Sequence, residues 1–404
     1  MSKMADGVQS SGLALAGAQF FFTLGWTVYA LMLPGLLATA GIAASWLPML
    51  LMVDQLIFAV MDIGFGVVAD RMGEGYRRLA KLLLVLSTLS AVAFMLLPMA
   101  AGLSSGILLS VLAVWVISTS VVRAPTLVLL AKQAKATQQR SLVIWYIAGM
   151  GLASALSPFF GLWLKGVDPR LPFTISAVAL LLAVVVLLRV SGQGVAAKSE
   201  ENPPRPASFS AYAPLLLVLG LAAFGFQIHA FVNAAPLYLA QAAKESLPWL
   251  MPLLWVGFFV TLIGVEPLVK RLGAMPMATL GILLTAMSSY ASAAVNGQHV
   301  LILLQLLAGA GWALAFAGLM EQAAVAGSRG AEGRFMGSFF AVTAICALAR
   351  IAFATQWLPN LKDIQFVLPA ALLLAAGLIA ATMEATAGPR GNARKWAKTK
   401  PPSR

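Results

Sequence analysis

The sequence predicts an all-α membrane protein whose twelve transmembrane helices form two pseudo-symmetric halves of six helices each. Three observations predict this class: the composition, the length of the apolar runs, and a repeat between the two parts of the chain. Of the 404 residues, 60% are hydrophobic and only 10% are charged. A soluble domain carries about 25% charged residues, so the composition excludes a soluble enzyme.

Twelve apolar stretches are each long enough to cross a bilayer as a helix, which takes about 20 residues. Proline, glycine or charged residues separate most of them, and the shortest junction is 296–298 between the ninth and tenth stretches. The expected limits are 13–38, 46–69, 79–99, 106–130, 141–164, 171–190, 211–240, 248–269, 275–295, 299–323, 335–357 and 364–385.

The basic residues predict the orientation of these spans. With the N-terminus placed inside, most of the 27 lysines and arginines fall in loops and ends on the inner side or in the tail after residue 386. The loops on the other side hold Lys165, Arg170, Lys244 and Lys362. By the positive-inside rule both termini are cytoplasmic. The polar start MSKMADGVQSSG lacks the features of a cleavable signal peptide, and we expect a multi-pass protein of a bacterial inner (plasma) membrane.

Several classes of site find no support in the composition. Cys346 is the single cysteine, and the two histidines, His229 and His299, are far apart in the chain, so we expect no metal site. No phosphate-binding glycine loop is present, which argues against ATP as the energy source, and we expect no enzyme activity. We expect no cofactor, no nucleic-acid partner and a monomer in the lipid bilayer; a solvated, topology-setting role accounts for the basic tail.

The chain divides after its sixth span. We expect a first half at 1–190, a polar cytoplasmic linker at 191–210, a second half at 211–386 and a basic tail at 387–404. The two halves also resemble each other: Asp70-Arg71-Met72-Gly73 follows the second span, and Lys270-Arg271-Leu272-Gly273 follows the eighth. In parallel-repeat transporters of this plan, the solute binds between the halves near the membrane midplane.

The segment 66–73, Gly-Val-Val-Ala-Asp-Arg-Met-Gly, resembles the signature loop of the major facilitator superfamily (MFS) between its second and third spans. The resemblance implies the MFS fold and a cytoplasmic gate that holds the halves together, with Asp70 and Arg71 in the gate. One departure is the insertion at 74–76 before the two arginines that normally follow at once. The residues implied for the gate are Gly66, Asp70, Arg71, Gly73, Arg77 and Arg78, together with Glu266, Lys270 and Arg271 beside the second copy.

Two shorter matches point to different MFS subfamilies. Asp62 ahead of Asp70-Arg71 is similar to the segment of cation-coupled sugar symporters in which the first aspartate helps bind the cation, although Ile63 replaces a proline. The segment 157–161, Ser-Pro-Phe-Phe-Gly, is similar to the glycine-rich kink of proton-coupled drug antiporters, with Ser157 replacing a glycine. These matches leave the direction of transport open.

Four charged side chains fall deep inside predicted spans, where a charge is costly and normally faces a partner or a water-filled cavity. Counted at about 1.5 Å per residue, Asp54 and Arg350 lie at one depth, and Asp62 and Arg123 at another. We therefore expect an Asp54–Arg350 bridge between the halves and an Asp62–Arg123 pair within the first half. Each pair could be a static lock, a proton relay in which a protonated aspartate releases its arginine, or an arginine clamp for an anionic substrate.

Polar and aromatic residues of three spans mark the expected substrate cavity. They are Gln19, Thr23, Trp26, Gln227, Asn233 and Trp312. His229 is a candidate proton carrier, because histidine titrates near neutral pH; a histidine bonded to a neighbouring helix is the alternative.

The sequence thus predicts a secondary transporter that moves a small organic solute by alternating access, with protons preferred over sodium as the coupling ion. A drug-type proton antiporter is the second hypothesis, and a receptor or assembly factor on the same scaffold is the third.

Overall fold

The computed structural model describes the chain except residues 1, 73–75, 132–135, 192–208, 328–329 and 388–404. The described part is helical and contains no β-strand. Within it, twelve helical stretches are long and apolar enough to cross a membrane, which confirms the predicted class. Most of the expected linker and tail, and Gly73 of the expected gate, lie outside the described residues.

The described residues form sixteen α-helices, because several spans are built from more than one helix and the short α12 lies between two spans. Those of the first half are α1 (Ser2–Thr39), α2 (Leu47–Arg71), α3 (Tyr76–Ala101), α4 (Ser105–Thr119), α5 (Ala124–Ala131), α6 (Ala136–Trp163) and α7 (Arg170–Ser191). Those of the second half are α8 (Phe209–Ile228), α9 (Ala234–Leu239), α10 (Leu247–Leu250), α11 (Pro252–Ile263), α12 (Val265–Leu272), α13 (Ala274–Ala294), α14 (Gln298–Gly327), α15 (Glu332–Ala352) and α16 (Leu368–Ala387).

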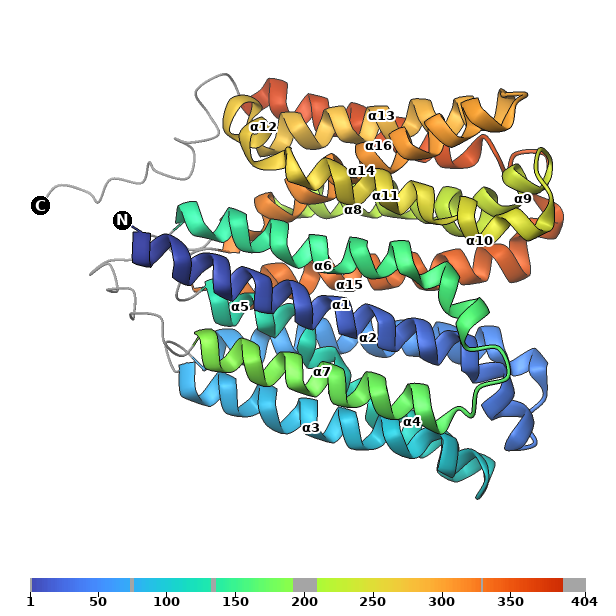
Figure 1. The fold of residues 1–404 in the computed structure, drawn as a ribbon. Helices are drawn as coiled ribbons and strands as arrows, with labels where there is room; N and C mark the ends of the chain where they lie inside the picture. The colour runs from blue at the N-terminus through green and yellow to red at the C-terminus, as the bar shows by residue number, and fades with distance from the viewer. Residues whose placement is uncertain (1, 73–75, 132–135, 192–208, 328–329, 388–404) are drawn as a thin grey trace, which may run out of the picture.

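The two halves lie side by side with their helices roughly parallel (Figure 1). Helix α15 packs along α2, and α11 packs along α6, so these four helices form most of the interface between the halves. Helix α1 begins and α16 ends at the same end of the bundle (Figure 1). We call this the terminal end.

Prolines account for the interruptions of several spans, because proline has no N–H and its ring clashes with the preceding turn. Pro125 follows the break between α4 and α5, and Pro236 follows a π-helical turn, His229–Asn233, between α8 and α9. A second π-helical turn, Phe353–Trp357, follows α15 and leads to Pro359. Such turns are frequent at functional sites.

The span limits agree closely with those expected from sequence, with one correction. The eighth span was expected to reach residue 269 but ends at Ile263. Gly264 closes it, and the short α12 that follows carries Glu266, Lys270 and Arg271. The narrow junction between the ninth and tenth spans is present, and Gly297 adopts a φ of 131° there, a conformation that suits glycine.

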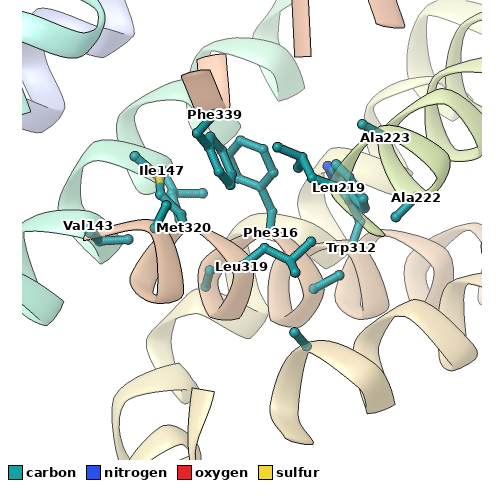
Figure 2. Packing of buried hydrophobic residues seen from close by; sticks show 14 of the residues in the cluster. Val143, Ile147, Leu219, Ala222, Ala223, Trp312, Phe316, Leu319, Met320 and Phe339 are labelled. Carbon is teal, nitrogen blue, oxygen red and sulfur yellow. The ribbon is translucent and has the colours of Figure 1, made fainter. Parts of the chain in front are cut away.

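The largest apolar cluster crosses from one half to the other. Figure 2 shows Phe316 and Met320 of α14 in this cluster, with Val143 and Ile147 of α6 to one side. Leu219 of α8 and Phe339 of α15 belong to the same cluster and are also drawn. Burial of these side chains holds the halves together without directional bonds.

Candidate functional site

Arg123 lies where the fourth span is broken. A 3-10 turn, Ser120–Val122, ends α4, and Arg123 itself has non-helical torsion angles (φ −82°, ψ −99°). Pro125 cannot continue an uninterrupted helix here. The backbone oxygen of Val122 accepts a hydrogen bond from Gln19 Nε2 at 2.8 Å. The break therefore positions the arginine inside the membrane-spanning region.

Asp62 and Arg123 form the ion pair expected within the first half. Arg123 Nη1 is 3.4 Å from Asp62 Oδ2, and the Asp62 side chain is completely buried. Within the described part of the chain, neither carboxylate oxygen of Asp62 accepts a hydrogen bond. The guanidinium also contacts the faces of two rings, 5.0 Å from the centre of Phe58 and 5.3 Å from that of Phe340, and such contacts stabilise a cation.

Arg123 also contacts the second half. Its Nη2 donates to the Phe340 backbone oxygen at 3.3 Å and to Thr343 Oγ1 at 3.4 Å, both on α15. Sequence reasoning missed this link, because its acceptors are a carbonyl and a threonine that no motif marks. The arginine therefore joins the buried carboxylate of α2 to a helix of the other half.

The expected Asp54–Arg350 bridge is not formed in this structure. Asp54 is buried and accepts a 2.6 Å hydrogen bond from the Tyr29 hydroxyl. The Arg350 guanidinium lies over the ring of Phe231 instead, 4.6 Å from its centre. Counting residues along a span predicted the depth of each side chain but not the direction in which it points around its helix.

His229 and Asn233 bind within the second half rather than facing a cavity. His229 is buried and its ring nitrogens contact Gln305 Oε1 at 3.1 Å and Ser289 Oγ at 3.0 Å. Asn233 Nδ2 donates to the Gln365 backbone oxygen at 3.0 Å, and Gln365 returns a bond to the Asn233 side chain. These contacts favour the alternative in which His229 fixes neighbouring helices.

The other expected cavity residues fall into two groups. Thr23, Trp26 and Gln227 are partly exposed, and Gln227 Nε2 donates to the Thr343 backbone oxygen at 3.3 Å. Gln19 and Trp312, by contrast, are buried. Trp312 stacks on Phe226 with ring centres 4.3 Å apart and belongs to the apolar cluster (Figure 2). In this structure Gln19, Trp312 and Asn233 are buried, and their role in a substrate cavity stays a prediction.

Asp70 connects the halves at the terminal end. Its two carboxylate oxygens accept backbone hydrogen bonds from Gly333 N at 2.6 Å and Arg334 N at 2.9 Å, in the first turn of α15. A carboxylate at this position satisfies free amide groups and interacts favourably with the helix dipole. Gly66 lies against the same turn, and a Cβ there would come within 2.1 Å of the Gly333 oxygen.

The remaining residues of the expected gate do not repeat this arrangement. Arg71, Arg77, Arg78 and Arg271 are exposed. Glu266 binds Lys270 one turn away on α12, an exposed pair with Nζ and Oε1 2.7 Å apart. The second copy of the motif therefore forms an ion pair within α12 in this structure and, unlike Asp70, does not connect the halves through this pair.

A second connection at the terminal end was not predicted. Arg140 of α6 binds Glu321 of α14, with Nη2 2.6 Å and Nε 2.7 Å from Oε1. Glu321 is the acidic residue of the tenth span, and its charge is the feature of the sequence that could have indicated an ion pair here. Together, Asp70 and the Arg140–Glu321 pair hold the halves closed at this end.

Removing the Asp70 charge should loosen this closure. In Asp70→Asn we expect a shift of about 1–2 kcal/mol toward states open at the terminal end, because the charge–dipole interaction and one accepting oxygen are lost. Distances between spin labels at Arg189 in α7 and Val325 in α14 would measure the shift, after replacement of Cys346 by alanine. Unchanged distance distributions in mutant and parent would show that Asp70 does not control this end.

Comparison with known proteins agrees with this geometry. The family model of the Major Facilitator Superfamily matches residues 15–351. The chain therefore belongs to this family of membrane transporters, which is generally non-enzymatic. No curated protein matches the sequence.

Solved transporter structures share the fold at low sequence identity. The human organic anion transporter MFSD10 has a TM-score of 0.72 at 15% identity, covering 92% of this chain and 99% of its own. The E. coli fucose:proton symporter FucP has a TM-score of 0.68 at 13% identity, covering 92% and 98%. A bacterial homologue of the iron transporter ferroportin, in an outward-facing state, has a TM-score of 0.69 at 12% identity, covering 92% and 98%.

Proposed function

We propose that the protein is a proton-coupled secondary transporter that moves a small organic solute by alternating access, with Asp62 as the proton-accepting group. The observation that carries the proposal is the connection from Asp62 through Arg123 to α15 of the other half. A proton that neutralises Asp62 removes the counter-charge of Arg123. The arginine then depends on its contacts with α15, so protonation changes how strongly the halves are connected.

The surroundings of Asp62 favour a proton over sodium. A sodium ion would need several oxygen ligands and would be repelled by the guanidinium 3.4 Å from the carboxylate. A proton adds no bulk and needs a single oxygen. The likeness in fold to a fucose:proton symporter is compatible with this coupling but does not carry it.

The proposal also includes the orientation of the protein in the membrane and the division of the chain into two halves. We place the terminal end in the cytoplasm of a bacterial cell, on the charge distribution described above, and assign transport to the halves at 1–190 and 211–386. Closure at the terminal end then corresponds to a state in which the cytoplasmic side is shut.

The test uses purified protein in proteoliposomes and a solute found by thermal stabilisation across a metabolite and drug panel. In Asp62→Asn, transport driven by a pH gradient should fall to background, because the neutral side chain carries no proton. Exchange of labelled for unlabelled solute should persist, because it requires no net proton movement. Asp363→Asn, an exposed carboxylate, is the matched control and should retain both activities.

Two results would contradict the proposal. If Asp62→Asn retains pH-driven transport, Asp62 is not the proton carrier. If both activities are lost while the protein stays folded, the pair is required for movement itself. Reversing the gradient with the parent protein distinguishes symport from the drug-type antiport, since the solute moves with the proton in one case and against it in the other.

A further inference from the structure

Arg350 is a charged residue of the eleventh span that has no carboxylate partner among the described residues. Its Nε is buried without a hydrogen-bond acceptor, and the contact of its guanidinium is with the face of the Phe231 ring. The acid at the same depth, Asp54, already accepts a hydrogen bond from Tyr29. An unpaired cation inside a membrane protein is costly, so such a residue marks a functional site.

Arg350 and Phe231 lie on the side of the second half that faces the first. The Phe231 ring contacts Arg350 of α15 and Trp255 of α11, with the two ring centres 6.1 Å apart. Helices α15 and α11 make most of the contacts of the second half with the first. Phe231 is nevertheless 51% exposed, and Arg350 is partly exposed. Gln227 lies one turn before Phe231 and donates a hydrogen bond to the Thr343 backbone oxygen of α15. Gln227 and Phe231 therefore both contact α15.

We propose that Arg350 binds the carboxylate of the transported solute and that the solute is an organic anion with a single negative charge. This assignment rests on the proposed function and adds the substrate class. A guanidinium can hold a carboxylate through two parallel hydrogen bonds.

Charge balance favours a monoanion over a dianion. Of the two arginines deep inside the spans, Arg123 is already neutralised by Asp62. Arg350 therefore contributes one uncompensated positive charge to this face, and a monocarboxylate neutralises it. A phosphate or dicarboxylate would leave a negative charge in a low-dielectric environment.

The proposal is tested by equilibrium binding to the detergent-purified protein. The probes are a panel of monocarboxylates, including benzoate, lactate and glycolate, each paired with its neutral amide. We expect at least one acid to raise the unfolding temperature while its amide does not. For that acid, Arg350→Gln should weaken binding roughly 10- to 100-fold, the effect of losing a charge-assisted bidentate contact. Arg350→Lys should fall between the two, and the exposed Arg170→Gln should match the parent.

Two outcomes would overturn the assignment: no monocarboxylate of the panel binds, or Arg350→Gln binds the acid as tightly as the parent does. The unfolding temperature of the empty protein gives a second criterion. A binding arginine without a protein partner predicts that Arg350→Gln is as stable as the parent or more stable. A clear loss of stability that is restored by adding Asp54→Asn would show instead that Arg350 is the structural partner of Asp54.

This experiment is independent of proton coupling. Binding is measured without a gradient, so its failure leaves the test of Asp62 untouched. Conversely, pH-driven transport by Asp62→Asn would refute the coupling proposal and leave anion binding at Arg350 intact.

Discussion

Replacing Gly66 with valine is expected to abolish transport while leaving the purified protein folded. A Cβ at Gly66 would come within 2.1 Å of the Gly333 oxygen, and a Cβ at Gly333 would come equally close to the Gly66 oxygen. Both obstacles are backbone atoms, which cannot move aside as a flexible side chain can. The contact lies between the halves, so valine should prevent closure at the terminal end without disturbing the packing within either half.

Gly149 provides the matched control. A Cβ there would come within 2.0 Å of the Ala16 oxygen, a contact between α6 and α1 inside the first half. The rocking motion of two rigid halves does not relieve this clash. Gly149→Val should therefore lower the unfolding temperature, because overpacking a core destabilises the folded state by about 1–3 kcal/mol or more.

Thermal unfolding and the Arg189–Val325 label distances together distinguish the two effects. Gly66→Val should unfold near the temperature of the parent and show only the longer distances. If it instead unfolds as early as Gly149→Val, the Gly66–Gly333 contact is part of the permanent fold and not of a gate. If it keeps the short distances of the parent, the gate tolerates the added bulk.

The fold could be predicted from sequence because it depends on signals that are local. Apolar runs, their separators and the repeated loop motif indicated the helices and their family, and the limits agree within a few residues except where Gly264 ends the eighth span early. Depth within a span is also local, since it follows from residue number, and it brought Asp62 and Arg123 together correctly.

The site was predicted less well because partner choice depends on the direction of each side chain and on neighbours distant in sequence. Tyr29 is the clearest case: its hydroxyl binds Asp54 from α1, and nothing in the sequence marks it as a competitor of Arg350. Trp312 was expected to line a cavity because of its ring, yet an aromatic ring is equally suited to the core, where the structure places it. The Arg140–Glu321 connection involves two helices whose contact could not be anticipated from the repeat.

The second large effect concerns the two members of the buried pair, which should not be equivalent. Replacing Arg123 with methionine, which has no donor, leaves Asp62 completely buried with no hydrogen bond to its carboxylate. Removing one partner of a buried pair in this way costs roughly 3–5 kcal/mol. Transport should also be lost, because the connection to Phe340 and Thr343 of the other half is removed.

Asp62→Asn should cost less stability than Arg123→Met. The arginine keeps its two acceptors on α15 and its contacts with the rings of Phe58 and Phe340. Contacts of these kinds stabilise a cation by about 1–2 kcal/mol each. The difference is what permits an uncoupled protein to remain folded and to exchange solute, and it makes Asp62 rather than Arg123 the group that can change its charge during a transport cycle.

Unfolding temperatures of the two single mutants and of Asp62→Asn with Arg123→Met measure this asymmetry. The expected order of stability places Arg123→Met lowest, Asp62→Asn close to the parent, and the double mutant above Arg123→Met, because the uncompensated carboxylate is gone. Equal losses in the two single mutants would mean that the α15 contacts do not support the arginine. A lower stability of Asp62→Asn than of Arg123→Met would mean that the carboxylate is the anchor of the site, and coupling through its protonation would have to be abandoned.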